Sequence, residues 1–456
     1  MRWIIIGAGI GGLSIGTLLA KEGVDILVLE KNEMLGGRCT SYEKNGYLVD
    51  FGPHIFTRGP NGPVGEICDR IGKKIHWNLL RDPRPIFKFP DREFEFSPKG
   101  LSTVVPKEEM NKAAELFTSL LEMPDHEIKS LDHVDLKSWV SKFTENKFIH
   151  SYIQAICAPA HGHLYDFVSA GEFVRCLREL TTDKSSAYPS GGCISIPKAY
   201  ADGIEEMGGK ILLGKEVSKI IIEDGKATGV ETKEGEFFQS DLIISNADIK
   251  HTVLNLIGED YLPKEYVSRV KELKYAGCGL ILNLGLAKKV TDQKFMYYSP
   301  SEDADDFFRM WLPEEREVPD RVGGLIAFPT NFDPSLSPKG KQLLSWVCAV
   351  PPKQDWRRVR EASLASLEDI FPGISKLIEW EEVVTPDRMK EFALEEGNAI
   401  GIAQTSDQVG EKRITQITPI ENLYLAGAEA GGHGVCTELA ANSALELFEI
   451  LKRKFL

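Results

Sequence analysis

The chain has 456 residues, which is too long for one simple hydrophobic core and predicts two domains or one discontinuous pair. Its content of 42% hydrophobic and 27% charged residues is that of an ordinary soluble globular protein. The formal net charge is −14 and no long Lys/Arg run is present. This balance argues against nucleic acid or an anionic membrane surface as the main partner.

Eight cysteines are scattered along the chain, with no CxxC pair and no short repeating spacing. Neither a disulfide framework nor a zinc site is supported, and a reducing, cytoplasmic setting is the simplest interpretation. No segment is long and apolar enough to span a bilayer, although peripheral contact with a membrane stays open.

The first forty residues have the pattern of a β-α-β unit. Residues 3–6 are continuous, apolar and mostly β-branched, as in a buried parallel strand. Helical spacing begins near Leu13 and ends at Gly23, and a second strand covers 26–29. The uncharged stretch 3–20 could also pass for a signal peptide, but its fixed glycine spacing and the strand that follows favour a folded unit.

The turn between the first strand and the helix carries the dinucleotide-binding pattern GxGxxG. Gly7 permits a tight turn, Gly9 lets the backbone approach a pyrophosphate, and Gly12 permits close packing of helix on strand. The N–H groups and the dipole at the helix N-terminus attract phosphate. The predicted contacts of this turn are Gly7, Ala8, Gly9, Ile10, Gly11 and Gly12.

An acidic residue stands where the ribose of a dinucleotide is expected. Glu30 lies 23 residues after Gly7, where a carboxylate accepts hydrogen bonds from ribose hydroxyls, and Lys31 lies beside it. A carboxylate there would repel a 2′-phosphate, so NADP is disfavoured. A glycine-rich packing turn without a ligand is the alternative, and it does not account for an acid at this spacing.

A second glycine pair follows the second strand, with an arginine after it. Gly36 and Gly37 let the backbone pass close to the same ligand, and Arg38 can pair with its phosphates. The ordered set of GxGxxG, acid, GGR and GYLVDFGPH (46–54) resembles the FAD-binding region of flavin amine oxidases, protoporphyrinogen oxidases and phytoene desaturases. This resemblance implies FAD as the cofactor and adds Pro53 and His54 to its predicted contacts.

Two later segments resemble the parts of this family that return to the flavin. From Tyr188 the chain predicts a helix to Met207, a strand ending near Val217 and a hairpin at 224–225, and the resemblance implies that Val217 contacts the adenine. A strand at 423–426 leads into a glycine loop and a C-terminal helix. There the resemblance implies the cofactor contacts Gly427, Glu429, Gly434 and Val435.

The resemblance implies an α/β fold, with a discontinuous Rossmann-like FAD-binding domain and an inserted α+β substrate domain. The expected FAD-binding domain consists of 1–80, 188–250 and 400–456, and the expected substrate-binding domain of 81–187 and 251–399.

The expected substrate domain has its own patterns. Residues 108–182 are mostly helical in pattern, and 275–287 have the pattern of a buried strand. Residues 85–96 alternate about a Pro-Asp-Arg turn, as in a hairpin. One face of this hairpin is either ordinary core or the wall of an apolar substrate tunnel, and it carries Phe87, Phe89, Phe94 and Phe96.

Few side chains stand out as catalytic. The resemblance puts His54 and His433 near the flavin, where either could act as an acid, a base or a polar anchor, and structural roles stay open for both. His161 and His163 with Asp166 could be drawn as a metal site. Nothing else at ligand spacing supports a metal, so a loop between helices is expected there.

The choice of branch within the family rests on absences and on local resemblance. Many flavin amine oxidases carry a lysine on a strand of the substrate domain, whereas the corresponding strand here, 277–286, has none, and no aromatic cage residue lies near 431–435. Residues 331–346 look more like those of phytoene desaturases, although 427–435 lack their Pro-Gly-rich form. The expected reaction is hydride transfer between flavin N5 and a C–C unit of a small apolar molecule, an isoprenoid, with an unidentified electron acceptor.

Two alternatives remain at this stage. One is an oxidase of amines or porphyrinogens that passes electrons to O₂. The other is a lipid carrier, because Rab GDP-dissociation inhibitors share this fold and bind prenyl groups without redox chemistry. The intact GGR segment and the C-terminal glycine loop favour bound flavin, and therefore an enzyme.

Overall fold

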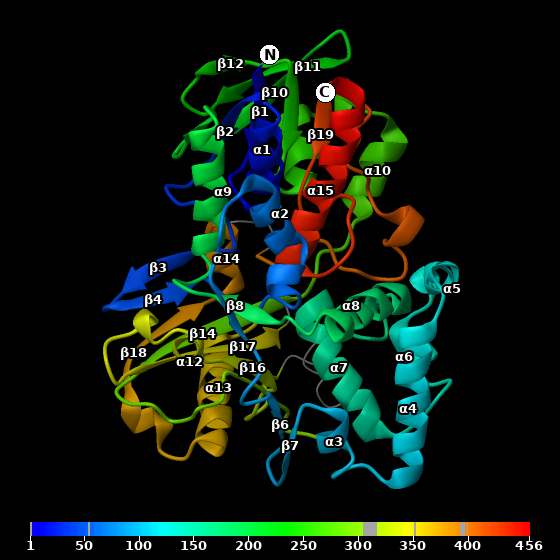
Figure 1. Cartoon of the computed structure of the whole chain (residues 1–456), viewed down its shortest axis with the longest axis vertical. Coiled ribbons are helices and arrows are strands. Elements are labelled where there is room, and N and C mark those ends of the chain that lie inside the picture. The colour runs from blue at the N-terminus through cyan, green and yellow to red at the C-terminus, as the bar shows by residue number, and fades with distance from the viewer. Residues whose placement is uncertain (1, 53–54, 304–316, 351–352, 393–396, 399) are drawn as a thin grey trace.

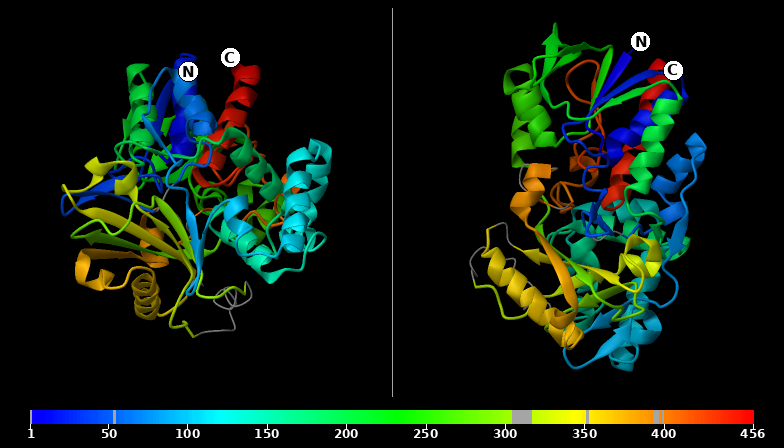
Figure 2. Two further views of the ribbon diagram at one scale, coloured as in Figure 1. Left: turned by 60° about the horizontal axis from the view of Figure 1, so that its bottom comes forward. Right: turned by 90° about the vertical axis from the view of Figure 1, so that its left-hand side faces the viewer.

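The computed structural model describes residues 2–52, 55–303, 317–350, 353–392, 397–398 and 400–456. Its two large sheets lie in opposite halves of the molecule, one close to both chain ends and the other at the far end (Figure 1). A side view shows these halves one above the other, with helices against both of them (Figure 2). Among the described helices, none is long and apolar enough to cross a membrane.

The sheet near the chain ends has five parallel strands in the order β19-β13-β1-β2-β9. Its strands come from segments far apart in the sequence: β1 (Arg2–Ile6), β2 (Asp25–Leu29), β9 (Lys210–Leu212), β13 (Leu242–Ser245) and β19 (Leu423–Leu425). Trp3 and Ile5 pack on one side of β1, whereas Ile4 and Ile6 pack on the other. A strand buried on both faces explains the unbroken apolar run at 3–6, and the α/β class is confirmed.

Helix α1 (Ile10–Lys21) follows β1 and begins earlier than the predicted start near Leu13. Gly11 and Gly12 lie inside its first turn, although glycine disfavours helix in isolation. Their missing side chains permit the contact, since a Cβ on Gly12 would lie 2.1 Å from the carbonyl oxygen of Gly7. Close packing of helix on loop therefore outweighs the low propensity.

Both faces of the parallel sheet are covered. Four helices pack on the side of Trp3 and Ile5: α1, α2 (Pro63–Ile71), α9 (Ser195–Glu206) and α15 (Cys436–Phe455). On the side of Ile4 and Ile6 lie a three-stranded antiparallel sheet and the helical segment after β13: β10 (Val217–Glu223), β11 (Lys226–Thr232), β12 (Phe237–Gln239), the π-helical turn His251–Ile257 and α10 (Lys264–Glu272).

The predicted hairpin at 224–225 is confirmed, because β10 and β11 pair antiparallel about Asp224 and Gly225, both with positive φ. The prediction of a strand ending near Val217 is wrong. Strand β9 ends at Leu212, the chain turns at Gly214 with a φ of 66°, and Val217 begins the next strand. The apolar pattern does not separate two short strands that are joined by a tight turn.

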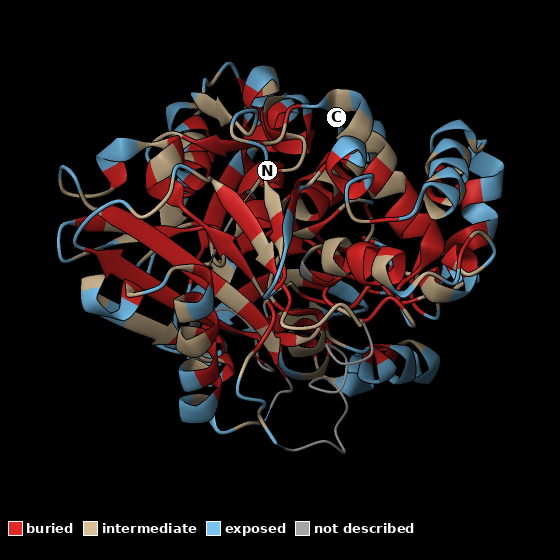
Figure 3. Ribbon diagram, turned by 90° about the horizontal axis from the view of Figure 1, so that it is seen from below, coloured by how far each residue is buried: buried red, intermediate tan, exposed pale blue. Residues whose placement is uncertain are grey.

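The second sheet has seven strands in the order β18-β14-β17-β16-β15-β6-β7. Strand β14 (Cys278–Leu286), which lies between β18 and β17, is buried along its whole length, as its pattern predicted. Seen from below, most residues of these strands are buried (Figure 3). Helix α13 (Trp356–Ile370) packs on one face, and the other strands are β6 (Ile86–Lys88), β7 (Glu93–Glu95), β15 (Phe295–Tyr298), β16 (Gly324–Ala327), β17 (Gln342–Val350) and β18 (Ile378–Val384).

A group of helices lies beside the second sheet and confirms the helical pattern of 108–182. Its members share one apolar cluster with the phenylalanines of the β6–β7 hairpin: α4 (Lys107–Glu122), α5 (Asp125–Ser130), α6 (Leu136–Val140), α7 (Lys147–His161) and α8 (Ala170–Asp183). The remaining short elements include α3 (Pro98–Leu101), α12 (Pro329–Phe332), α14 (Pro386–Phe392), β3 (Ser41–Lys44), β4 (Tyr47–Asp50), β5 (Trp77–Leu79) and β8 (Ala187–Pro189).

Candidate flavin and substrate site

A cavity of about 940 Å³ lies at the carboxyl ends of the parallel strands and extends to the second sheet. In open α/β sheets, ligands bind at this edge. One part of its lining consists of the glycine loops and the charged residues around them. The other part is mainly apolar and combines hairpin, helix and sheet residues: Phe87, Phe96, Phe173, Leu177, Leu180, Ile281, Tyr297, Leu325 and Val347.

The first glycine loop is packed so closely that side chains would not fit. A Cβ on Gly11 would lie 2.3 Å from Oδ1 of Asn246 and 2.7 Å from Cα of Gly427. A Cβ on Gly9 would lie 2.7 Å from Nδ2 of Asn246. The loop, the residue after β13 and the loop after β19 therefore meet at one point, at the N-terminus of α1.

The second glycine pair lies directly against the first loop. The Gly36 N–H donates to the carbonyl of Ala8 at 2.8 Å, and Gly36 also forms a bridge with Gly9. A Cβ on Gly37 would lie 3.5 Å from Cα of Gly9. The sequence expectation that GGR brings more backbone to the same ligand agrees with this geometry.

Glu30 supports the loop at the end of β2. One carboxylate oxygen accepts the Ala8 N–H at 2.7 Å, and the other accepts the backbone and side-chain N–H groups of Asn32, each at 2.9 Å. The side chain is buried and lines the cavity together with Lys31. A carboxylate held here can also accept ribose hydroxyls, so the predicted role of Glu30 is compatible with its position.

Arg38 and Glu429 both line the cavity, and each lies near enough to influence the pKa of the other. Burial lowers the pKa of Arg38, and burial raises the pKa of Glu429 to about 8, with the nearby Asp248 acting in the same direction. Glu429 accepts the N–H of Ile249 at 2.7 Å through one oxygen. Its other oxygen and Nη1 of Arg38 have no hydrogen-bond partner among the described residues. Such groups fit a polar ligand with hydroxyl and phosphate oxygens.

These observations fit FAD. The glycine cradle leaves room for a pyrophosphate, the carboxylate of Glu30 suits a ribose, and the unpartnered Arg38 and Glu429 atoms suit the phosphates and the ribityl chain. When bound, FAD would supply the redox chemistry, while the chain holds and orients it.

Twelve of the predicted cofactor residues line the cavity: Gly7, Gly9, Ile10, Gly11, Glu30, Lys31, Gly37, Arg38, Val217, Gly427, Glu429 and Val435. Ala8, Gly12 and Gly434 are not among the lining residues. The Ala8 N–H donates to Glu30, Gly12 packs against the carbonyl of Gly7, and the Gly434 carbonyl accepts a hydrogen bond from Gln404. Pro53 and His54 lie outside the described residues.

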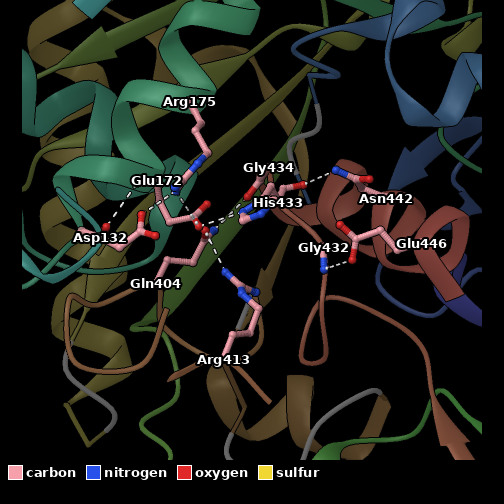
Figure 4. Close-up of polar contacts among 11 residues, drawn as sticks. Asp132, Glu172, Arg175, Gln404, Arg413, Gly432, His433, Gly434, Asn442 and Glu446 are labelled. Carbon is pink, nitrogen blue, oxygen red and sulfur yellow. Dashed lines mark hydrogen bonds and ion pairs between the residues drawn. The ribbon is translucent and has the colours of Figure 1, made fainter. Parts of the chain in front are cut away.

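His433 lies outside the cavity lining and faces helix α8 (Figure 4). Its Nδ1 lies 3.1 Å from Oε1 of Glu172, and its carbonyl accepts Nδ2 of Asn442 at 2.9 Å. The hydrogen bond to Glu172 raises the pKa of His433. The catalytic role predicted for His433 gains no support from this position, which suits a residue that ties the flavin loop to α8.

Glu172 is the buried centre of this contact. It is 1% exposed, and Arg175 Nη1 lies 3.2 Å from its Oε1 and 2.6 Å from Oδ1 of Asp132. Although burial raises the pKa of Glu172, the hydrogen bond from His433 and the charges of Arg413 and Arg175 outweigh it and bring the pKa to about 2. The carboxylate therefore stays charged at neutral pH.

Sequence reasoning did not connect several polar residues with this cavity, among them Asn246, Gln154 and His161. Asn246 had a usable signal, because it directly follows a buried strand whose carboxyl end lies at the ligand edge. The sequence predicts a loop at His161, with a metal site as the alternative, whereas the residue is the last of α7. Among the described residues, no group of three His, Cys, Asp or Glu side chains is placed to hold a metal.

Comparisons with known proteins agree with this geometry. A family model described as flavin containing amine oxidoreductase matches residues 10–446. The zeta-carotene-forming phytoene desaturase of Myxococcus xanthus is similar at 27% identity, covering 96% of this chain and 92% of that protein. The chloroplastic prolycopene isomerase of Arabidopsis thaliana is 26% identical, with coverage of 93% and 78%. The solved structure of an oxidoreductase from Methanosarcina mazei matches with a TM-score of 0.81, 23% identity and coverage of 98% and 100%.

Proposed function

Because the chain belongs to the family of flavin-containing amine oxidoreductases, we propose that it transfers hydride between N5 of FAD and a carbon–carbon unit of an apolar, isoprenoid substrate. That the protein is an FAD-dependent oxidoreductase agrees with the sequence prediction. The identity of the substrate and the reaction performed on it are what we propose in addition.

The main observation behind the proposal is that a single cavity has a polar part and an apolar part. The glycine loops, Glu30 and Arg38 line its polar part, and phenylalanine, leucine and valine side chains line the rest. Apolar walls of this kind bind a substrate mainly by removing its surface from water. Among the hairpin phenylalanines, Phe87, Phe89 and Phe94 belong to the apolar core, and Phe87 and Phe96 also line the cavity, so these two are candidates for a substrate wall.

The names of the relatives support an isoprenoid substrate. One is called a phytoene desaturase and another a prolycopene isomerase, and both are similar over most of this chain. These names belong to those proteins, and they make carotenoid-type polyenes the first class to test here.

An amine substrate fits the cavity less well. A protonated amine requires a carboxylate or an aromatic cage near the reacting end. Each described acidic residue of the lining already accepts a hydrogen bond or an ion pair from the protein, and none lies among the apolar walls: Glu30, Glu216, Asp248, Glu429 and Glu438. Strand β14, which lines the apolar part through Ile281, has no lysine.

The chain's own side chains would position the substrate and exclude water. Helix α8 presents Phe173, Leu177 and Leu180 at helical spacing along one wall, and β15 and β17 present Tyr297 and Val347 from the second sheet. Water-free walls of this kind would shield a hydride transfer from competing protons.

The test is anaerobic reduction of the flavin in the FAD-loaded protein. Phytoene, zeta-carotene and prolycopene are added in detergent micelles, and putrescine is added in parallel as a representative amine. Loss of the oxidised-flavin absorbance with a polyene, together with a more unsaturated product, supports the proposal. Flavin reduction by putrescine and by none of the polyenes contradicts it.

An isoprenoid substrate dissolves in bilayers rather than in water, so we also propose peripheral contact with a membrane. Co-sedimentation with neutral phosphatidylcholine vesicles tests this contact, and the net charge of −14 predicts weaker binding to anionic vesicles. Absence of the protein from the pellets of both the neutral and the anionic vesicles contradicts the proposed membrane contact.

A further inference from the structure

We propose that the apolar substrate carries one neutral oxygen group, a hydroxyl or a carbonyl, which binds over Ala158 between Gln154 and His161 of helix α7. This inference rests on the proposed function, because it specifies the substrate of the same cavity. It distinguishes an oxygenated isoprenoid from a pure hydrocarbon.

The three residues share one face of α7. Ala158 is four residues after Gln154 and three residues before His161, so its Cβ is a helical neighbour of both side chains, about 5–6 Å from each. All three line the cavity. Because alanine ends at Cβ, the space between the two polar side chains is left for an occupant.

The side-chain amide of Gln154 has a donor group, Nε2, without an acceptor among the described residues. Its Oε1 accepts the N–H of Tyr165 at 2.8 Å, which fixes the orientation of the amide. Its Nε2 is buried and has no partner in the described part of the chain. The side chain is 2% exposed, so bulk water does not satisfy this donor. An oxygen atom of a bound molecule would supply the missing acceptor.

His161 is the second buried polar side chain on this face of α7. It is 1% exposed, and neither ring nitrogen makes a hydrogen bond of good geometry among the described residues, although the backbone of Cys157 and of Glu172 lies near enough to raise its pKa. Its ring centroid lies 5.9 Å from that of Phe173, which also lines the cavity. A second polar side chain lacking a partner, on the same helix face, indicates a polar subsite within mainly apolar walls.

The charge state of His161 indicates a neutral occupant. Burial lowers its pKa to about 4, although the Glu172 charge and the carbonyls of Cys157 and Glu172 act in the opposite direction. A neutral imidazole has one donor and one acceptor, so it can bind either a hydroxyl or a carbonyl. A carboxylate would find no positive charge at this subsite, and the nearby Glu172 carboxylate is already paired with Arg175 and His433.

The subsite lies toward the flavin end of the cavity. Ala160, next to His161, accepts a weak hydrogen bond through its carbonyl from Sγ of Cys436 at 3.7 Å. Cys436 begins helix α15, which follows the predicted flavin loop. The oxygen group would therefore fix how far the substrate extends past the flavin, and so which carbon–carbon unit reacts.

The experiment compares two ligands that differ in one group. Geranylgeraniol and the hydrocarbon in which hydrogen replaces its hydroxyl are titrated into the FAD-loaded protein, and Kd is measured from the change in oxidised-flavin absorbance. We expect the alcohol to bind about tenfold more tightly or better, because the hydrocarbon leaves buried polar atoms unpaired.

Two variants test the residues, and a third is the matched control. Gln154→Leu and His161→Phe should each bring the alcohol-to-hydrocarbon ratio to about threefold or less and bind the hydrocarbon at least as tightly as wild type. Ser151→Ala lies on the same helix and also lines the cavity, but its hydroxyl already donates to the carbonyl of Glu302 at 2.6 Å. It should leave the ratio unchanged.

Three results would overturn the inference alone, and a fourth would contradict the proposed function on which it rests. Equal binding of both ligands to the wild-type protein removes the polar subsite while leaving the proposed function intact. An unchanged ratio in Gln154→Leu and His161→Phe assigns the discrimination to other residues. Loss of FAD from both variants, with their folds retained by circular dichroism, assigns the two side chains to the cofactor. Failure of both ligands to bind, with flavin reduction by putrescine, contradicts the proposed function itself.

Discussion

The contact between His433 and Glu172 joins the flavin loop to the helix that lines the substrate cavity. Because Glu172 raises the pKa of His433, the folded-state pKa lies above the unfolded value near 6.5. Arg175 and Arg413 also face the imidazole and act in the opposite direction. The stability from this pair is therefore fully present below pH 6.5 and is lost as pH rises through the folded pKa.

We expect His433→Asn to lower Tm by about 1 °C at pH 6 and by less at pH 9. The effect is small because the His433 side chain is 45% exposed and water screens the charge. Thermal scans of both proteins across this pH range measure the difference. A Tm difference that is the same at every pH would show that the imidazole contributes packing alone.

Asn246 gives a second prediction at the scale of one residue. Its side chain touches the positions where Gly9 and Gly11 lack a Cβ, so it borders the place predicted for the pyrophosphate. Asn246→Asp keeps the shape and adds a negative charge, and we expect the Kd for FAD to rise at least tenfold. Titration of the apoprotein with FAD measures this change. Asn111→Asp, on the exposed face of α4, is the matched control and should leave the Kd unchanged.

Some residues of the candidate site could be predicted from the sequence and others could not. Glycines and Glu30 were predictable, because their spacing is set by a local β-α-β unit. Gln154 and His161 were not, since their importance depends on which face of α7 meets the cavity. That face is decided by packing against α8 and the second sheet, which no local pattern encodes.

At the scale of elements, glycines in the first turn of helix α1 and after its C-terminus have different structural roles. Gly11 is required by contact, because a Cβ would meet Asn246 and the backbone of Gly427. Gly23 follows the end of the same helix with a φ of 87°, and a Cβ there would meet no described atom within 4 Å. The first therefore serves the junction of three segments, and the second only ends the helix.

Alanine substitutions separate these purposes. We expect Gly11→Ala to raise the Kd for FAD at least tenfold, because the loops must move apart. Gly23→Ala should leave that Kd unchanged and lower the free energy of unfolding by about 1 kcal/mol through backbone strain. FAD titration and urea denaturation of both variants check the pair. Similar FAD affinities for the two variants would contradict the role given to Gly11.

Helices and strands were predicted well where a long segment has one hydrophobic period. They were predicted less well where two short elements follow one another. The long buried strand β14 and the amphipathic helices of 108–182 followed from their patterns. Strand β9 has three residues, and only a tight turn separates it from β10, so no period distinguishes the two. The start of α1 was misplaced because its first-turn glycines are held by tertiary contacts.

At the scale of the whole molecule, the cavity is lined by segments that are distant in sequence. Its polar part combines the loops after β1, β2, β13 and β19, and its apolar part combines α7, α8 and the second sheet. A ligand in the polar part would therefore contact the N-terminal, middle and C-terminal parts of the chain together. Its binding energy would oppose their separation.

Removal of FAD should accordingly lower the thermal stability of the whole protein. A ligand at a hundredfold excess over its Kd stabilises the folded state by about 2.7 kcal/mol, which for a chain of this length corresponds to a Tm change of about 3 °C. Tm is measured for the apoprotein and after addition of FAD or FMN, which lacks the adenylate that Glu30 and Val217 are predicted to contact. FAD should raise Tm more than FMN does. An equal Tm with FAD, with FMN and without either would show that the glycine cradle does not join these segments through the cofactor.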